Sequence, residues 1–325
     1  MSLKHARLLT FLVSTYLFFT ACNKSPVRPE AIDESTEVEI KGANPIVSDA
    51  KHTIPEILGK VFTTSISGTR MLLVEPGVFS MGSPEHEQGR ETIETLHEVN
   101  LTKHFWLGVN ELTRLEWEKV MNPIEPSISN DTEVDEDKVS EDPFSDLTRP
   151  HYPKVQVSWV EAMDFCQKLT ELESKAGKLP ANYTYTLPTE AQWEFSCRAG
   201  TSTATAFGNS LGPGDASIDP QRPYGAVAKA RIPKQLQRVG KYKPNGWGFY
   251  DTHGNAAEWC RDFFFARYPS GSITDPLYDK PTGLKVKRGG SYFLGGVSAR
   301  SAKRGSDAPT RKSDTLGFRI ALVKE

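Results

Sequence analysis

The stretch NGWGFYDTHGNAAEWCRDFF, residues 245–264, places two carboxylates on either side of a glycine-containing turn. Asp251 precedes the turn and Glu258 follows it, with Gly254 and Ala256 between them. Carboxylate oxygens and inward-facing backbone carbonyls are the ligands that Ca²⁺ prefers. The spacing is not that of an EF-hand, however, and a tight surface turn with two solvated acids explains the same residues equally well. The residues alone leave a calcium site and an empty turn as alternatives.

The composition is that of a globular, turn-rich protein. The chain has 325 residues, of which 38% are hydrophobic, and it contains 25 glycines and 22 prolines. This content favours an irregular α+β fold over a helical bundle. The formal net charge of −2 gives no general attraction to nucleic acid, so we expect no nucleic-acid partner.

The first 22 residues have the layout of a lipoprotein signal peptide. A basic start is followed by an apolar run that is too short to anchor the chain across a bilayer. The tetrapeptide FTAC, residues 19–22, resembles a bacterial lipobox, in which Cys22 becomes the lipidated first residue. Asn23 after this cysteine indicates the outer membrane. We expect a lipid-anchored protein of the bacterial cell envelope whose partner is an envelope protein or another envelope component; the alternative is a plain signal peptide.

The rest of the chain divides into a tether and one domain. Residues 23–60 are polar, contain prolines and show no periodicity, which predicts a flexible tether. Residues 61–325 are interpreted as a single domain, because their patterned segments are short and no second linker separates them. Within this domain, residues 122–150 are dense in Asp, Glu, Ser and Pro. Such a run predicts a solvated acidic insertion loop rather than a cation site.

Short strands and three helices are expected in the domain. Residues 71–83 predict two short strands around a Pro-Gly turn, and the alternating apolar residues of 97–113 predict one half-buried strand. Each helix start is marked by a hydroxyl residue followed three positions later by Glu or Gln, the pattern of a capping box. These pairs are Thr113 with Glu116, Ser158 with Glu161 and Thr189 with Gln192. The third helix is expected to end at Gly200, since glycine adopts a left-handed conformation readily.

Seven sequence blocks occur in order from residue 71 to the C-terminus. They are MLLVEPGVFSMGS, HEVNLTKHFWLGVNELTRLEWEKVM, VQVSWVEAMDFC, YTLPTEAQWEFSCRAGT, NGWGFYDTHGNAAEWCRDF, RGGSYF and TLGFRIAL. Together they closely resemble the formylglycine-generating enzyme family, also called the sulfatase-modifying factor domain. The resemblance implies a compact, loop-rich α+β fold related to C-type lectins, with little regular secondary structure.

The resemblance favours calcium at the opening turn. It implies a structural Ca²⁺ held by side-chain oxygens of Asp251 and Glu258 and by the backbone carbonyls of Gly254 and Ala256. The family has a second calcium site in the preceding loop, which corresponds here to residues 208–225. That segment departs too far from the family pattern for ligands to be assigned.

The resemblance also implies a copper ion, held in the oxidases by two cysteine thiolates shortly after the RGGSY block. Soft thiolates are the natural ligands of Cu(I). Residues 288–304, RGGSYFLGGVSARSAKR, contain no cysteine, and Leu294 stands where the first thiolate is expected. Two further departures are Ala257 in place of a tryptophan and Thr315 in place of an asparagine. We therefore expect no copper and assign no catalytic residue.

The remaining cysteines also depart from the family. Cys166 and Cys197 match cysteines that form disulfides in some relatives. Their partner positions here correspond to Ile320 and Ser301, so the resemblance implies that neither bridge forms.

Four residues near the C-terminus are candidates for a binding pocket: Ser291, Arg288, Arg300 and Arg319. Guanidinium groups around a cleft hold carboxylates or phosphates through paired hydrogen bonds. The alternative is structural, since arginines also brace loops by donating to backbone carbonyls. No local pattern of two histidines and a carboxylate predicts an iron site.

These observations favour an envelope lipoprotein whose domain is a binding or scaffold module rather than an oxidase. One alternative is an oxidative or tailoring enzyme that uses the same pocket with a different metal. The other is a sulfatase maturation enzyme that draws its thiols from Cys197 or Cys260.

Overall fold

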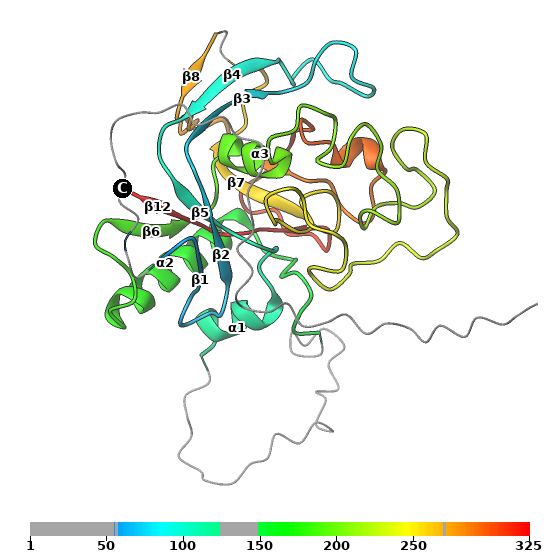
Figure 1. Cartoon of the computed structure of the whole chain (residues 1–325). Coiled ribbons are helices and arrows are strands. Elements are labelled where there is room, and N and C mark those ends of the chain that lie inside the picture. The colour runs from blue at the N-terminus through cyan, green and yellow to red at the C-terminus, as the bar shows by residue number, and fades with distance from the viewer. Residues whose placement is uncertain (1–54, 56–57, 124–148, 269–270) are drawn as a thin grey trace, which may run out of the picture. The chain divides into compact units, whose positions relative to one another are not determined.

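Short strands and long connections dominate the domain (Figure 1). The computed structural model describes residues 55, 58–123, 149–268 and 271–325. The predicted signal peptide with Cys22, most of the tether and most of the acidic insertion lie outside these residues. In the part that is described, three small sheets and three α-helices form the α+β fold with little regular structure that the sequence predicts.

The largest sheet has five antiparallel strands with β5 at its centre. Their order is β1 (Val61–Thr63), β2 (Arg70–Val74), β5 (Phe105–Gly108), β12 (Ala321–Lys324) and β6 (Tyr183–Thr186). Helix α2 (Trp159–Lys175) packs against β6, and α1 (Arg114–Met121) packs against α2. The sheet therefore joins strands from the two ends of the domain.

Aromatic side chains fill the space between these helices and the C-terminal segment. Trp117 of α1 stacks on Phe165 of α2, with ring centroids 5.5 Å apart. Phe318 meets Phe165 edge to face at 5.7 Å. Offset and edge-to-face contacts of this kind add to the free energy gained by burying the rings. Phe318, from the C-terminal sequence block, thus packs into the same core as the aromatic residues of α1 and α2.

Two smaller sheets complete the domain. The three-stranded sheet has the order β3 (Gly77–Met81), β4 (His97–Leu101) and β8 (Ile273–Thr274). The four-stranded sheet has the order β10 (Gly305–Asp307), β9 (Lys285–Arg288), β7 (Ala257–Phe263) and β11 (Leu316–Gly317). Helix α3 (Glu190–Arg198) contacts β3, β7 and β9, so it bridges both sheets. A 3₁₀ turn, η2 (Gly296–Ala299), follows β9.

All three predicted capping boxes are confirmed. In each, the hydroxyl of Thr113, Ser158 or Thr189 accepts a backbone N–H three residues on, and the longer side chain bonds back to the cap. The predicted end of α3 is also confirmed. The helix ends at Arg198, and Gly200 has the expected left-handed conformation, with φ 84°; Ala199, the C-cap, is left-handed as well, with φ 47°.

The prediction of one strand over residues 97–113 is wrong. This segment forms β4 and β5, which belong to different sheets. Strand β4 alternates between buried and exposed residues, as predicted, whereas every residue of β5 is buried. Strand β5 is buried throughout because it lies between β2 and β12 and because hydrophobic side chains pack against both of its faces.

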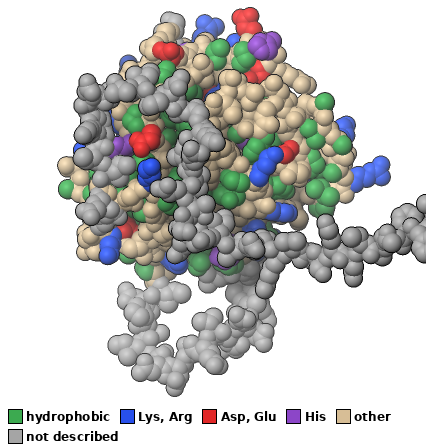
Figure 2. Space-filling model, in the orientation of Figure 1, with side chains coloured by type: hydrophobic (Ala, Val, Ile, Leu, Met, Phe, Trp, Pro, Cys, Tyr) green, Lys and Arg blue, Asp and Glu red, His purple; other side chains and the backbone are tan. Residues whose placement is uncertain are grey.

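The face shown in Figure 2 carries Lys and Arg side chains interspersed with Asp, Glu and hydrophobic ones. Within the described ranges, no helix has both the length and the apolar character needed to cross a membrane.

The capping box of α2 yields a first prediction. Replacing Ser158 with Ala removes the acceptor for the Glu161 N–H and is expected to lower the free energy of unfolding by about 1 kcal/mol. Ser174→Ala is the matched control, because Ser174 is exposed within the same helix and its loss should change stability by less than about 0.5 kcal/mol. Urea denaturation measures both. Equal effects of the two substitutions would contradict a capping role.

Candidate functional site

A cavity of about 290 Å³ lies beside the end of β9. Its wall is formed by the glycine turn after β9, by residues near η2, by β10 and by the segment 311–316. Gly290 is required in this turn for two reasons: its φ is 72°, and a Cβ would lie 2.7 Å from the carbonyl oxygen of Ser298. The glycine therefore lets the turn approach η2 closely and sets the place of Ser291 on the wall.

Arg288, the last residue of β9, lines the cavity and is held from behind by helix α3. Its Nη1 donates to Glu190 Oε1 at 3.1 Å, and its Nη2 donates to Glu194, one turn further along the helix. Arg304 donates to both oxygens of Glu190 at 2.7 Å. Burial would raise the pKa of Glu190, but the guanidinium of Arg304 holds that pKa below its usual range. These side chains form a buried network of charged groups.

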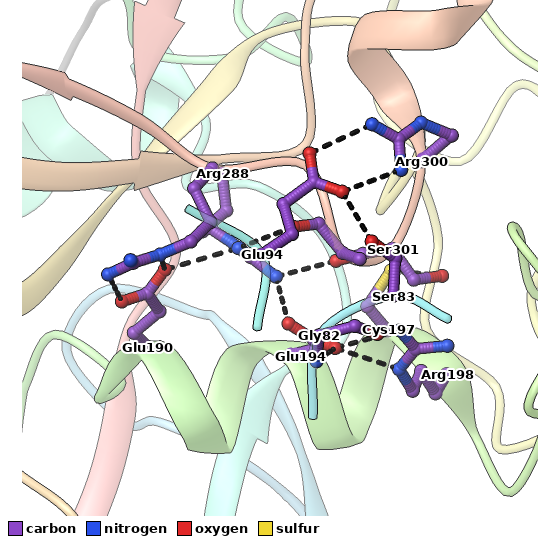
Figure 3. A network of polar contacts seen from close by, with 12 residues as sticks. Gly82, Ser83, Glu94, Glu190, Glu194, Cys197, Arg198, Arg288, Arg300 and Ser301 are labelled. Carbon is purple, nitrogen blue, oxygen red and sulfur yellow. Dashed lines mark hydrogen bonds and ion pairs between the residues drawn. The ribbon is translucent and has the colours of Figure 1, made fainter. Parts of the chain in front are cut away.

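The network continues to the loop between β3 and β4 (Figure 3). Arg198 Nε donates to Glu194 Oε1 at 2.9 Å, and the Gly82 N–H donates to the same oxygen at 2.9 Å. Arg300 donates to both carboxylate oxygens of Glu94, from Nη2 at 2.8 Å and from Nη1 at 2.9 Å. The loop that follows β3 is thereby fixed to α3 and to the segment after η2. Sequence reasoning missed the glutamates of α3, because Arg288 and Arg304, which join them to the cavity wall, lie about a hundred residues away.

The four predicted pocket residues separate into two pairs. Arg288 and Ser291 line the cavity, whereas Arg300 and Arg319 are not among its lining residues. Arg319 is buried in a two-point ion pair with Glu258, in which Nε and Nη2 each donate at 2.6 Å. It also donates to the carbonyl of Tyr250 at 2.9 Å. Arg300 and Arg319 thus play the bracing role that was the structural alternative.

Ser291 and Arg288 each carry a buried polar atom without a hydrogen-bond partner within the described ranges, namely Ser291 Oγ and Arg288 Nε. The side chains are 2% and 1% exposed. Buried donors in proteins nearly always have an acceptor, so two unsatisfied ones in the wall of one cavity are unusual.

The predicted calcium turn is compact and already bonded. The Gly240 N–H donates to Asp251 Oδ2 at 2.7 Å, and burial raises the pKa of Asp251 to about 6. Besides Arg319, Trp193 Nε1 donates to Glu258 Oε2 at 2.7 Å. In the part of the chain that is described, no three His, Cys, Asp or Glu side chains are arranged to hold a metal ion. Calcium bound through Asp251, Gly254, Ala256 and Glu258 stays a prediction, and it would have to share Glu258 with Arg319.

Glu111 organises the same turn and was missed from the sequence. Its Oε1 accepts the Ala256 N–H at 2.8 Å, and its Oε2 accepts Asn255 Nδ2 at 2.6 Å. Burial and the nearby carboxylate of Asp251 raise the pKa of Glu111 well above its usual range. The position of the residue in the second sequence block was the available signal, but nothing local shows where its side chain points.

The cysteines of the described domain are free and buried. Cys197 Sγ lies 3.8 Å from Ser301 Oγ, so these two positions do face each other, as the resemblance implied. Cys197 also lies 3.7 Å from His253 Nε2. His253 Nδ1 donates to the Ala299 carbonyl at 2.7 Å, and its Nε2 accepts the Ala206 N–H at 3.0 Å. Both ring nitrogens are therefore engaged by the backbone.

The contact between Cys197 and Ser301 predicts an engineered disulfide. Ser301→Cys is expected to form a bridge with Cys197 under oxidising conditions and to stabilise the domain by about 2–4 kcal/mol, because the closed loop is long. Thermal melts with and without reductant measure the effect. The double variant Cys197→Ala, Ser301→Cys is the control and should show no difference between the two melts. Failure of the single variant to oxidise would contradict the geometry.

Comparison with known proteins shows that the chain is similar to members of one family. Residues 59–324 match the model of the sulfatase-modifying factor enzyme 1-like domain. The chain is 27% identical over 300 residues to the formylglycine-generating enzyme of Bos taurus, covering 78% of this chain and 74% of that protein. It is 35% identical over 192 residues to the enzyme of the same name from Streptomyces coelicolor, covering 54% of this chain and 55% of that protein.

Two solved structures have a similar fold. PvdO from Pseudomonas aeruginosa superposes with a TM-score of 0.62 and 26% identity, covering 82% of this chain and 98% of PvdO. Treponema denticola variable protein 1 superposes with a TM-score of 0.60 and 23% identity, covering 82% of this chain and 99% of that protein. The second likeness concerns the fold alone.

Proposed function

Because the chain belongs to the family of sulfatase-modifying factor enzyme 1-like domains, we propose that it is a non-oxidative binding module that uses the cavity beside β9. The observation that carries the proposal is the chemistry of the cavity wall. Leu294, which stands where the oxidases of the family have their first copper-binding thiolate, lines the cavity, and none of the described lining residues is a cysteine. Soft thiolates select Cu(I), oxygen ligands do not replace them, and the described lining has no histidine either.

The three described cysteines do not supply the missing thiolates. Burial raises the pKa of Cys166 and Cys260 above the usual range, so both remain thiols. Cys197 is buried and is not part of the cavity wall. This placement weighs against sulfatase maturation by rearranged cysteines.

The cavity retains features of a binding site. Ala257 and Thr315, the other two departures from active relatives, both line it. A small side chain at position 257 leaves space where a tryptophan would otherwise stand. A concave site with a few convergent polar groups is the usual form of a ligand-binding pocket. Fold alone does not fix function, and here the wall supports binding rather than oxygen chemistry.

The proposal includes a location. Lipidation at Cys22 would hold the module at the bacterial cell envelope, with the outer membrane favoured by Asn23. The tether of residues 23–60 would let the domain reach an envelope protein or another envelope component.

Copper binding and cysteine oxidation test the proposal. The purified protein, given Cu(I), O₂ and a cysteine-containing sulfatase peptide, is expected to form no formylglycine and to lose Cu(I) to a competing chelator. The double variant Leu294→Cys, Ser298→Cys places two thiols on the cavity wall and should gain Cu(I) affinity. Formylglycine produced by the unmodified protein above a copper-free control would overturn the proposal.

Calcium binding at the turn is a second proposal about the same fold. A ligand that binds only the folded state raises its stability by mass action, so chelation should lower the melting temperature. Asp251→Ala is expected to abolish the calcium response. Glu258→Ala is the less informative variant, because it leaves Arg319 buried without its carboxylate and destabilises the fold with or without calcium. An identical melting temperature with calcium and with chelator would refute the site.

A further inference from the structure

The cavity wall has donors that the protein itself does not satisfy. Arg288 Nε is an obligatory donor, and Ser291 Oγ can donate as well as accept. Both atoms are buried, and neither has a partner among the residues that the structure describes. Asp307 is the only carboxylate of the described wall, and it already accepts from Lys287 Nζ at 3.0 Å. None of the described residues supplies the acceptor that would complete this wall, and a bound ligand would supply it.

The charges around the cavity indicate that this acceptor is an anion. Four of the five cationic side chains of the described wall have carboxylate partners within the protein. These pairs are Lys287 with Asp307, Arg288 with Glu190 and Glu194, Lys303 with Glu91, and Arg304 with Glu190. The fifth, Arg311, is exposed and makes no ion pair within the described residues. Arg311 is therefore the cation of the described wall that is available to attract an anion to the opening.

Apolar side chains lie at the same opening. Phe293 is 56% exposed and Leu294 is 42% exposed, although both are large hydrophobic residues that line the cavity. Lys234 Nζ lies 5.0 Å from the centre of the Phe293 ring, but its charge is already paired with Asp219 at 2.9 Å. Exposed apolar residues that are grouped beside a polar cavity are typical of a binding surface rather than of a solvated loop.

We propose that the cavity binds a carboxylate carried on an apolar group. A carboxylate oxygen accepts from Ser291 Oγ, and the exposed guanidinium of Arg311 attracts the negative charge to the opening. The apolar body lies against Phe293 and Leu294. This inference rests on the proposed function, because it names the ligand class of the same site.

Fluorine NMR titration with para-fluorobenzoate tests the inference, with para-fluorobenzamide as the neutral probe of the same shape. Benzoate is expected to bind saturably with a dissociation constant of roughly 1 mM, as befits a fragment with few atoms. The neutral amide should bind at least about tenfold more weakly, since charge-assisted hydrogen bonds are the stronger ones. Equal binding of the two probes would overturn the inference.

Matched variants locate the binding. Ser291→Ala and Arg311→Gln should each weaken benzoate binding by about three- to tenfold, and Arg311→Gln should also reduce its dependence on salt. Ser272→Ala and Arg70→Gln are the controls, because both residues are exposed and neither lines the cavity. Ser291→Ala removes no hydrogen bond within the described protein, so its melting temperature should not fall. Unchanged affinity in both cavity variants would refute the site.

Two further outcomes separate this inference from the proposed function. Inorganic phosphate that competes with benzoate and binds more tightly would replace the carboxylate with a dianion and overturn the ligand class. Absence of benzoate binding, together with absence of formylglycine formation, would reject this inference and leave the non-oxidative module standing. Formylglycine formation would reject the proposed function whatever the benzoate result.

Discussion

The buried ion pairs between Arg288 and the glutamates of α3 hold the functional part of this domain in place. Arg288 ends β9 and Glu190 and Glu194 lie one turn apart on the helix, so a single side chain joins a sheet to a helix (Figure 3). Removing one member of such a pair leaves a buried charge unpaired, which typically costs about 3–5 kcal/mol. The glycine turn that carries Ser291 begins at the next residue, and its position therefore depends on this contact.

The same network explains why so many arginines produce so little free positive charge. Arg198, Arg300, Arg304 and Arg319 are all buried and paired with glutamates. They also donate to backbone carbonyls of the long connections, such as those of Gly82, Gly89, Ile93 and Tyr250. The chemistry left to a ligand is consequently narrow: the hydroxyl of Ser291, the exposed guanidinium of Arg311 and the apolar side chains of Phe293 and Leu294.

Local features of the chain were predictable, and features that depend on distant contacts were not. The capping boxes at Thr113, Ser158 and Thr189 form within four residues, so reading the sequence suffices to find them. The segment 97–113 looked like one strand, because alternation of apolar residues carries no information about which sheet each half joins. Arg288 and Arg319 both stand in recognisable sequence blocks. Arg288 nevertheless lines the cavity, whereas Arg319 pairs with Glu258 in the core, and the sequence does not distinguish these two positions.

The sequence by itself determined the family, the α+β class, the three helix starts and the absence of cysteine between residues 288 and 304. Each of these is a property of residue identity or of neighbours along the chain. Only the tertiary structure decided that Glu111 holds the turn at Ala256 and that Glu190 and Glu194 pair with Arg288. It also decided that Ser291 Oγ and Arg288 Nε have no hydrogen-bond partner among the described residues and belong to residues that line one cavity. The physical reason is that a hydrogen bond or ion pair depends on the distance between atoms, which residues a hundred positions apart acquire only when the chain has folded.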